Sequence, residues 1–162
     1  MSTGFLSHPS SLAADRFSDV PPGTDIARTL TDILIRASGI GPKDRVLVFG
    51  PDMSRHVTGL AAAGCGSATG IRSDERVLRR ERAEVVWFTG IRDAAGMAAI
   101  GRCDAESARL IAIDLPAAGD GRALPGILRT LAARGFVRCA TLTVEDRLVI
   151  TVSRPNWLRR VI

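Results

Sequence analysis

Short, uninterrupted apolar runs alternate along the chain with segments in which apolar residues recur every three or four positions. The first such segment follows the Pro-Pro-Gly breaker at residues 21–23 and continues to Gly39, which predicts a helix with Thr24 as its N-cap. A Gly-Pro-Lys-Asp turn then precedes residues 45–49, whose sequence Arg-Val-Leu-Val-Phe is typical of a buried strand. The opening of the chain therefore predicts a helix followed by a buried strand.

The two kinds of segment continue to alternate toward the C-terminus. Further helices are expected over residues 53–63, 74–82, 94–100 and 124–133, and further strands over residues 67–72, 84–88, 108–115, 136–144 and 147–153. Strands that are separated by helices pair in parallel through right-handed crossovers. The last two strands are separated only by Glu145 and Asp146, so we expect them to form a tight antiparallel hairpin.

This order of elements predicts an α/β sandwich of three layers, in which helices cover both faces of a twisted, mainly parallel sheet. The strand at residues 45–49 should lie in its centre, flanked by the second and fourth strands of the chain. Its side chains show no polar alternation, as expected for a strand that is covered on both sides. Val46 and Val48 should therefore be buried.

The length of 162 residues and the apolar content of 46% fit one globular domain with a core of its own. We expect this domain to cover residues 24–155, with a loosely ordered arm at residues 1–23 and a tail at residues 156–162. No apolar stretch reaches the roughly 20 residues that span a bilayer, and the N-terminus lacks the pattern of a secretory signal. These features predict a globular protein that does not enter a membrane.

Cysteines and charges bear on the compartment and the partners. Cys65, Cys103 and Cys139 are spaced too widely for a zinc site or a disulfide framework, which favours reduced thiols and a cytoplasmic location. The formal net charge is +5, and Lys43 is the one lysine among 22 basic residues. The densest basic run, residues 72–82, is interleaved with acidic residues and is more typical of a solvated helix face than of a nucleic-acid site.

Three stretches of the chain resemble the class I S-adenosylmethionine-dependent methyltransferases. Residues 26–50, with their helix, turn and Arg-Val-Leu-Val-Phe-Gly strand, look like the opening of that family, and residues 68–78 look like its second strand and following helix. Residues 131–136 and the hairpin that runs up to Pro155 are similar to its closing antiparallel strands. The resemblance covers about residues 25–155 and implies a Rossmann-like fold with S-adenosylmethionine as the cofactor.

The resemblance also indicates which residues would hold that cofactor. In the family, the first strand carries an acidic residue and ends in a glycine-rich turn, against which the methionine part of the cofactor lies. Gly50 matches the first glycine, whereas Val48 stands at the acidic position, and Asp52 and Ser54 replace the next two glycines. Asp52 would place its carboxylate beside the carboxylate of the cofactor. The altered turn therefore predicts weakened cofactor binding.

Further departures follow the second and fourth strands. Arg72 stands where the family has an acidic residue that accepts the ribose hydroxyls, and a guanidinium can only donate; Asp74 could substitute through a shifted loop. Asp114, before Leu-Pro, stands at a catalytic or substrate-positioning motif, although an Asp before Pro is also common in turns. Arg72 and Arg92 follow strands that border the expected crevice and could hold a small anionic ligand, unless Arg72 pairs with Asp74 or Glu75.

The sequence thus favours a degenerate methyltransferase-like domain that works as a binding or regulatory module, alone or as a homodimer, without methyl transfer. The alternatives are an active methyltransferase of small molecules with an atypical cofactor loop, and an arginine-rich protein that associates with nucleic acid. A phosphate loop and a nucleophile elbow are both missing from the sequence. His56 follows the first strand, and we expect a lone surface imidazole there rather than one that faces a ligand.

Overall fold

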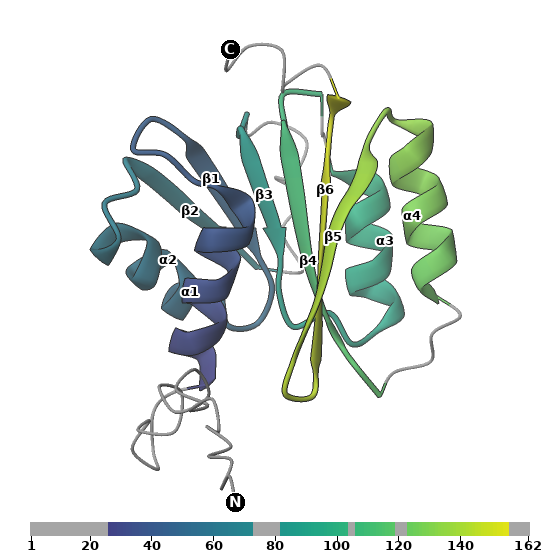
Figure 1. The fold of residues 1–162 in the computed structure, drawn as a ribbon, viewed down its shortest axis with the longest axis horizontal. Helices are drawn as coiled ribbons and strands as arrows, with labels where there is room; N and C mark the ends of the chain where they lie inside the picture. The colour runs from purple at the N-terminus through teal and green to yellow at the C-terminus, as the bar shows by residue number, and fades with distance from the viewer. Residues whose placement is uncertain (1–25, 73–81, 104–105, 119–122, 156–162) are drawn as a thin grey trace, which may run out of the picture.

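The protein is described by a computed structural model over residues 26–72, 82–103, 106–118 and 123–155. Four helices and six strands lie within these ranges (Figure 1). They are α1 (Ile26–Ser38), β1 (Arg45–Phe49), α2 (Met53–Ala62), β2 (Ser67–Ile71), β3 (Val85–Phe88), α3 (Ala94–Arg102), β4 (Leu110–Pro116), α4 (Ala123–Ala133), β5 (Val137–Val144) and β6 (Arg147–Ser153). The expected helix at residues 74–82, the cap at Thr24, the arm and the tail fall wholly or mostly outside the described residues.

The strands form one sheet in the order β2-β1-β3-β4-β6-β5. The pairs β1–β2, β1–β3 and β3–β4 are parallel, whereas β6 is antiparallel to both β4 and β5. The β5–β6 hairpin turns through Glu145, whose positive φ of 52° suits the tight connection. The mainly parallel sheet and the terminal hairpin are both confirmed.

Of the two neighbours predicted for the first strand, one is confirmed and one is wrong. β1 does lie beside β2, but its other neighbour is β3, with Val46 opposite Val85 and Phe49 opposite Phe88. β4, the fourth strand, pairs with β3 instead and lies one position further out. The strand that follows β2 in the chain, β3, pairs with the side of β1 that β2 does not occupy. The strand order therefore reverses between β1 and β3.

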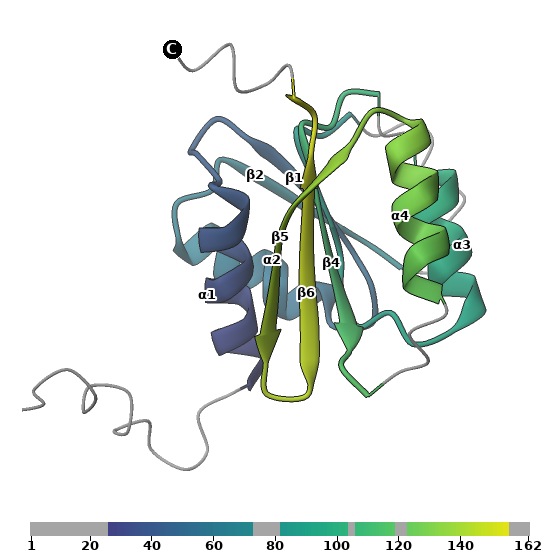
Figure 2. The ribbon, with the colours of Figure 1, turned by 45° about the vertical axis from the view of Figure 1, so that its right-hand side comes forward.

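Two helices cover each face of the sheet, as Figure 2 shows. α1 and α2 pack on the face that presents Val46 and Val48, whose side chains are 2% and 0% exposed, and this confirms their predicted burial. α3 and α4 pack on the face that presents Leu47 and Phe49. Alternate side chains of one strand thus enter two separate cores.

Polar contacts fix the helices on this frame. Trp87 of β3 is fully buried, and its indole nitrogen donates to the Ser38 hydroxyl at the end of α1 over 3.0 Å. Asp93 caps α3, since its carboxylate accepts a hydrogen bond of 2.8 Å from the backbone nitrogen of Gly96. Among the described helices, none is long and apolar enough to cross a bilayer.

Candidate functional site

The carboxyl ends of β1, β3 and β4 meet at one edge of the sheet, the lower edge in Figure 1. In an open α/β sheet, ligands bind beyond these ends, at the point where the strand order reverses. Here that point lies between β1, which leads into α2 on one face, and β3, which leads into α3 on the other. The candidate site is therefore formed by the segments that follow these strands.

The segments after β1 and β3 are in direct contact. The backbone nitrogen of Thr89 donates to the carbonyl oxygen of Phe49 over 2.8 Å, and the Thr89 hydroxyl donates to the same oxygen over 3.2 Å. Gly50 has a φ of 140°, and a Cβ added to it would lie 2.0 Å from the Thr89 carbonyl oxygen. Only glycine fits this position, so the residue that matches the family's cofactor turn is already required by the fold.

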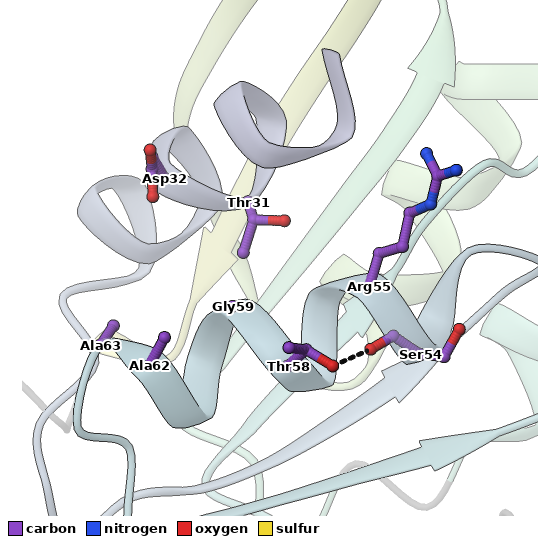
Figure 3. Close-up of a pocket in the computed structure, with 8 residues that line it drawn as sticks. All are labelled: Thr31, Asp32, Ser54, Arg55, Thr58, Gly59, Ala62 and Ala63. Atoms are coloured by element: carbon purple, nitrogen blue, oxygen red, sulfur yellow. Dashed lines mark hydrogen bonds between the residues drawn. The ribbon is translucent and has the colours of Figure 1, made fainter. Parts of the chain in front are cut away.

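Asp52 and Ser54 lie at the start of α2. Asp52 precedes the helix with an exposed side chain that makes no capping hydrogen bond, so its carboxylate is available at the positive end of the helix. Ser54 is exposed and lines a groove of about 590 Å³ between α1 and α2, with Thr31 and Asp32 on the opposite wall (Figure 3). Its carbonyl oxygen accepts a hydrogen bond of 2.9 Å from the Thr58 hydroxyl. Ser54 thus contributes to the interhelical groove.

His56 is buried, so the expectation of a surface imidazole is wrong. It lies four residues before Leu60 on the inner face of α2, and only 1% of it is exposed. Its Nδ1 is 2.8 Å from the Thr31 hydroxyl oxygen, and its ring meets Trp87 edge-on at 6.1 Å. Burial lowers the pKa of His56, against a weaker upward effect of the Asp114 and Asp52 carboxylates. The imidazole is therefore part of the packing between α1, α2 and the sheet.

Asp114 is buried at this edge and held by an ion pair and a backbone hydrogen bond. It is 1% exposed, and Arg147 of β6 donates to both of its carboxylate oxygens, over 2.8 Å and 2.7 Å. The backbone nitrogen of Gly90 donates to one of these oxygens over 3.0 Å, and that of Ile91 donates to the Asp114 carbonyl over 3.3 Å. Asp114 thus joins β4 to β6 and fixes the segment that follows β3.

Sequence reasoning missed Arg147. It is the first residue of a strand whose other residues are uncharged, Leu-Val-Ile-Thr-Val-Ser, and it is 8% exposed. A charged side chain that begins a buried strand requires a buried partner of opposite charge. Its position directly after the hairpin turn was the available signal, because the hairpin brings it to the end of β4 beside Pro116.

The remaining candidate residues lie in the segments that follow β2 and β3. Arg72 directly follows β2 and is exposed, and Asp74 lies outside the described residues. Arg92 follows β3, is exposed, and lines a separate cavity on the α3 and α4 side of the sheet. The two arginines therefore come from the two strands that flank β1. Within the described residues, His, Cys, Asp and Glu side chains form no group of three or more that could bind a metal ion.

Comparison with known proteins shows which folds this architecture is similar to. No protein-family model and no curated protein sequence matches the chain. Among solved structures, it is similar to a proposed RNA methyltransferase from Pyrococcus horikoshii, with 13% identity, a TM-score of 0.60 and coverage of 80% of this chain and 81% of the other.

Two further structures support the same assignment. One is a glycopeptide N-methyltransferase in complex with sinefungin, at 9% identity and a TM-score of 0.56, with 80% of this chain and 94% of the other covered. The other is a ribosomal protein L11 methylase from Lactobacillus delbrueckii subsp. bulgaricus, at 15% identity and a TM-score of 0.52, with 83% and 81% covered. The fold is therefore that of the class I methyltransferases. Identities this low establish the fold alone.

Proposed function

We propose that this methyltransferase-like domain is a binding or regulatory module that does not transfer methyl groups. The observation that carries the proposal is the burial and hydrogen bonding of Asp114, the acidic side chain expected at the catalytic position. It is buried, and it is bonded through both oxygens to Arg147 and through one of them to Gly90. A buried carboxylate whose two oxygens are both held by a guanidinium would have to break this pair before it could act on a substrate. His56, the other candidate base from the sequence, is equally buried.

The residues of the edge also fit S-adenosylmethionine poorly. Asp52 is exposed with an unpaired capping position, so the cofactor's own carboxylate would meet a second negative charge there. Arg72 follows β2, where the ribose hydroxyls need an acceptor. Each unpaired charge or lost hydrogen bond costs about 1 to 3 kcal/mol, so the two defects together would weaken binding by factors of tens to tens of thousands. We therefore derive no reaction step through the cofactor.

Calorimetric titration of the whole protein with S-adenosylmethionine tests the proposal. We expect at most millimolar affinity, and measurable recovery in the double variant with Asp52→Gly and Arg72→Asp, because both changes restore the family's residue types. Arg102→Asp combined with Asp146→Gly makes the same charge changes at exposed positions away from β1 and β2 and should recover nothing. Micromolar binding by the unmodified protein would refute the proposal.

One observation favours the alternative of an active methyltransferase. The similar structures include proteins named as methyltransferases of an RNA, a protein and a glycopeptide. An active enzyme would bind S-adenosylmethionine tightly and transfer radiolabelled methyl groups to a substrate. Association with nucleic acid is the third candidate, and it would appear as DNA or RNA binding that weakens steeply as the salt concentration rises. Sedimentation of the free protein tests the homodimer.

A further inference from the structure

A cavity of about 490 Å³ lies on the α3 and α4 side of the sheet, beside the edge already described. It is enclosed by the segment after β3, the first turns of α3 and α4, the end of β4 and the start of β6. Its apolar wall consists of Ile91, Met97, Leu115, Pro116, Leu124 and Leu148. A concave, mainly apolar cavity of a few hundred Å³ is typical of a small-molecule site.

The walls that the segment after β3 and the end of β4 contribute to this cavity are anchored by packing and by backbone hydrogen bonds. Ile91 and Leu115 are 4% and 7% exposed and belong to the core between the sheet and α3 and α4. The backbone nitrogen of Ile91 donates to the Asp114 carbonyl, and that of Ala117 donates to the Asp146 carbonyl over 2.6 Å. These bonds tie the two rims of the cavity to β4 and to the β5–β6 turn. A ligand would therefore lose little affinity to rearrangement of the protein.

Two charged residues of opposite sign line the cavity, and they differ in their contacts. The carboxylate of Asp93 accepts the hydrogen bond from Gly96 that caps α3. Arg92 is exposed and makes no ion pair with any residue in the described ranges. A guanidinium at the rim of an apolar cavity complements a carboxylate or phosphate attached to an apolar body.

We propose that this cavity binds a small amphipathic anion, whose apolar body fills the space between α3 and α4 and whose acidic group pairs with Arg92. The site lies on the opposite face of the sheet from α2 and shares no residue with the cofactor positions. The inference therefore stands whether or not the proposed function holds.

Three probes separate the parts of the proposal: decanoate, decanol and acetate, each titrated below any micelle concentration and followed by calorimetry and by amide NMR shifts. We expect decanoate to bind saturably and to shift the amides of residues 91–97 and 124. Decanol lacks the charge and should bind at least tenfold more weakly, and acetate lacks the apolar body and should not bind. Equal binding of decanol and decanoate would overturn the role of Arg92.

Variants locate the site. Arg92→Gln should weaken decanoate binding about tenfold or more and leave decanol unchanged, because a charge-assisted pair is lost. Ala94→Trp places a large side chain in the cavity and should abolish binding. Ala98→Trp is the matched control, since Ala98 is an exposed residue of the same helix that does not line the cavity. Failure of decanoate to bind, shifts that map elsewhere, or unaltered binding in Ala94→Trp would each overturn the proposal.

Discussion

Replacing Gly50 by alanine should be among the most destabilising single changes in this domain. Gly50 ends β1 with a φ of 140°, a conformation that residues with a Cβ rarely adopt. The new Cβ would lie 2.0 Å from the carbonyl oxygen of Thr89 and 2.7 Å from its hydroxyl oxygen. The carbonyl belongs to the backbone of the neighbouring segment, so no side-chain rotation can relieve this contact.

The size of the destabilisation follows from the separation of Gly50 and Thr89 that the new Cβ requires. Real Cβ contacts essentially never fall below 3.0 Å, so Gly50 and Thr89 must separate by about 1 Å. That shift would break the 2.8 Å hydrogen bond from Thr89 to Phe49, which contributes about 1 kcal/mol. Backbone strain adds about 1 to 3 kcal/mol and overpacking a similar amount. We therefore expect the free energy of unfolding to fall by about 3 to 7 kcal/mol, a large part of the roughly 5 to 15 kcal/mol of a typical domain.

Urea denaturation followed by circular dichroism measures this loss, and two other glycines serve as controls. Gly64 has a φ of 84° with no atom within 4 Å of an added Cβ, so Gly64→Ala should cost only about 1 kcal/mol of strain. Gly101 lies in α3 with equally open surroundings, and Gly101→Ala should be neutral or stabilise the helix by up to about 1 kcal/mol. If Gly50→Ala costs no more than Gly64→Ala, the contact between the segments after β1 and β3 does not restrict the backbone as argued.

Two further predictions concern the buried polar groups of the edge. Asp114→Asn leaves Arg147 buried without a charged partner and should lower the free energy of unfolding by about 3 to 5 kcal/mol. The double variant with Asp114→Leu and Arg147→Met removes both charges and should cost clearly less in the same urea assay. Equal costs would contradict a buried ion pair. His56 has a lowered pKa, so the unfolded chain binds more protons, and stability should fall as the pH drops below the unfolded pKa of about 6.5. Denaturation between about pH 8 and pH 5 should show a weaker pH dependence in His56→Gln, and an unaltered dependence would refute the assignment.

Strands that are buried on both faces were the part of the fold most accessible from the sequence. β1 occupies the predicted residues 45–49, and β6 the predicted residues 147–153. Both are short, mainly apolar and β-branched runs between turn residues, and such runs are typical of buried strands. The hairpin followed from the two-residue spacing alone. Local pattern was sufficient here because the limits of these elements are set by neighbouring residues.

Strand order depends on information that the pattern does not contain. Periodicity indicates that β3 and β4 are buried strands, but either could pair with Val46 and Phe49 of β1 with similar burial. The choice depends on how the chain crosses the sheet after β2. The burial of His56 was missed for a related reason, because its environment comes from Thr31 of α1 and Trp87 of β3, which are distant in sequence.

The polar residues of the carboxyl edge mostly stabilise the fold, and this affects how its chemistry is interpreted. Asp114 and Arg147 neutralise each other, and the backbone nitrogen of Gly90 donates a further hydrogen bond to the Asp114 carboxylate. The interior penalises any of these groups that loses its partner, so recruiting Asp114 for proton transfer would first require breaking the pair. Arg92, one strand away, is exposed beside an apolar cavity and carries no such penalty. The exposed Arg92 can therefore pair with an anion without the cost of breaking a buried ion pair, as the proposed anion site requires.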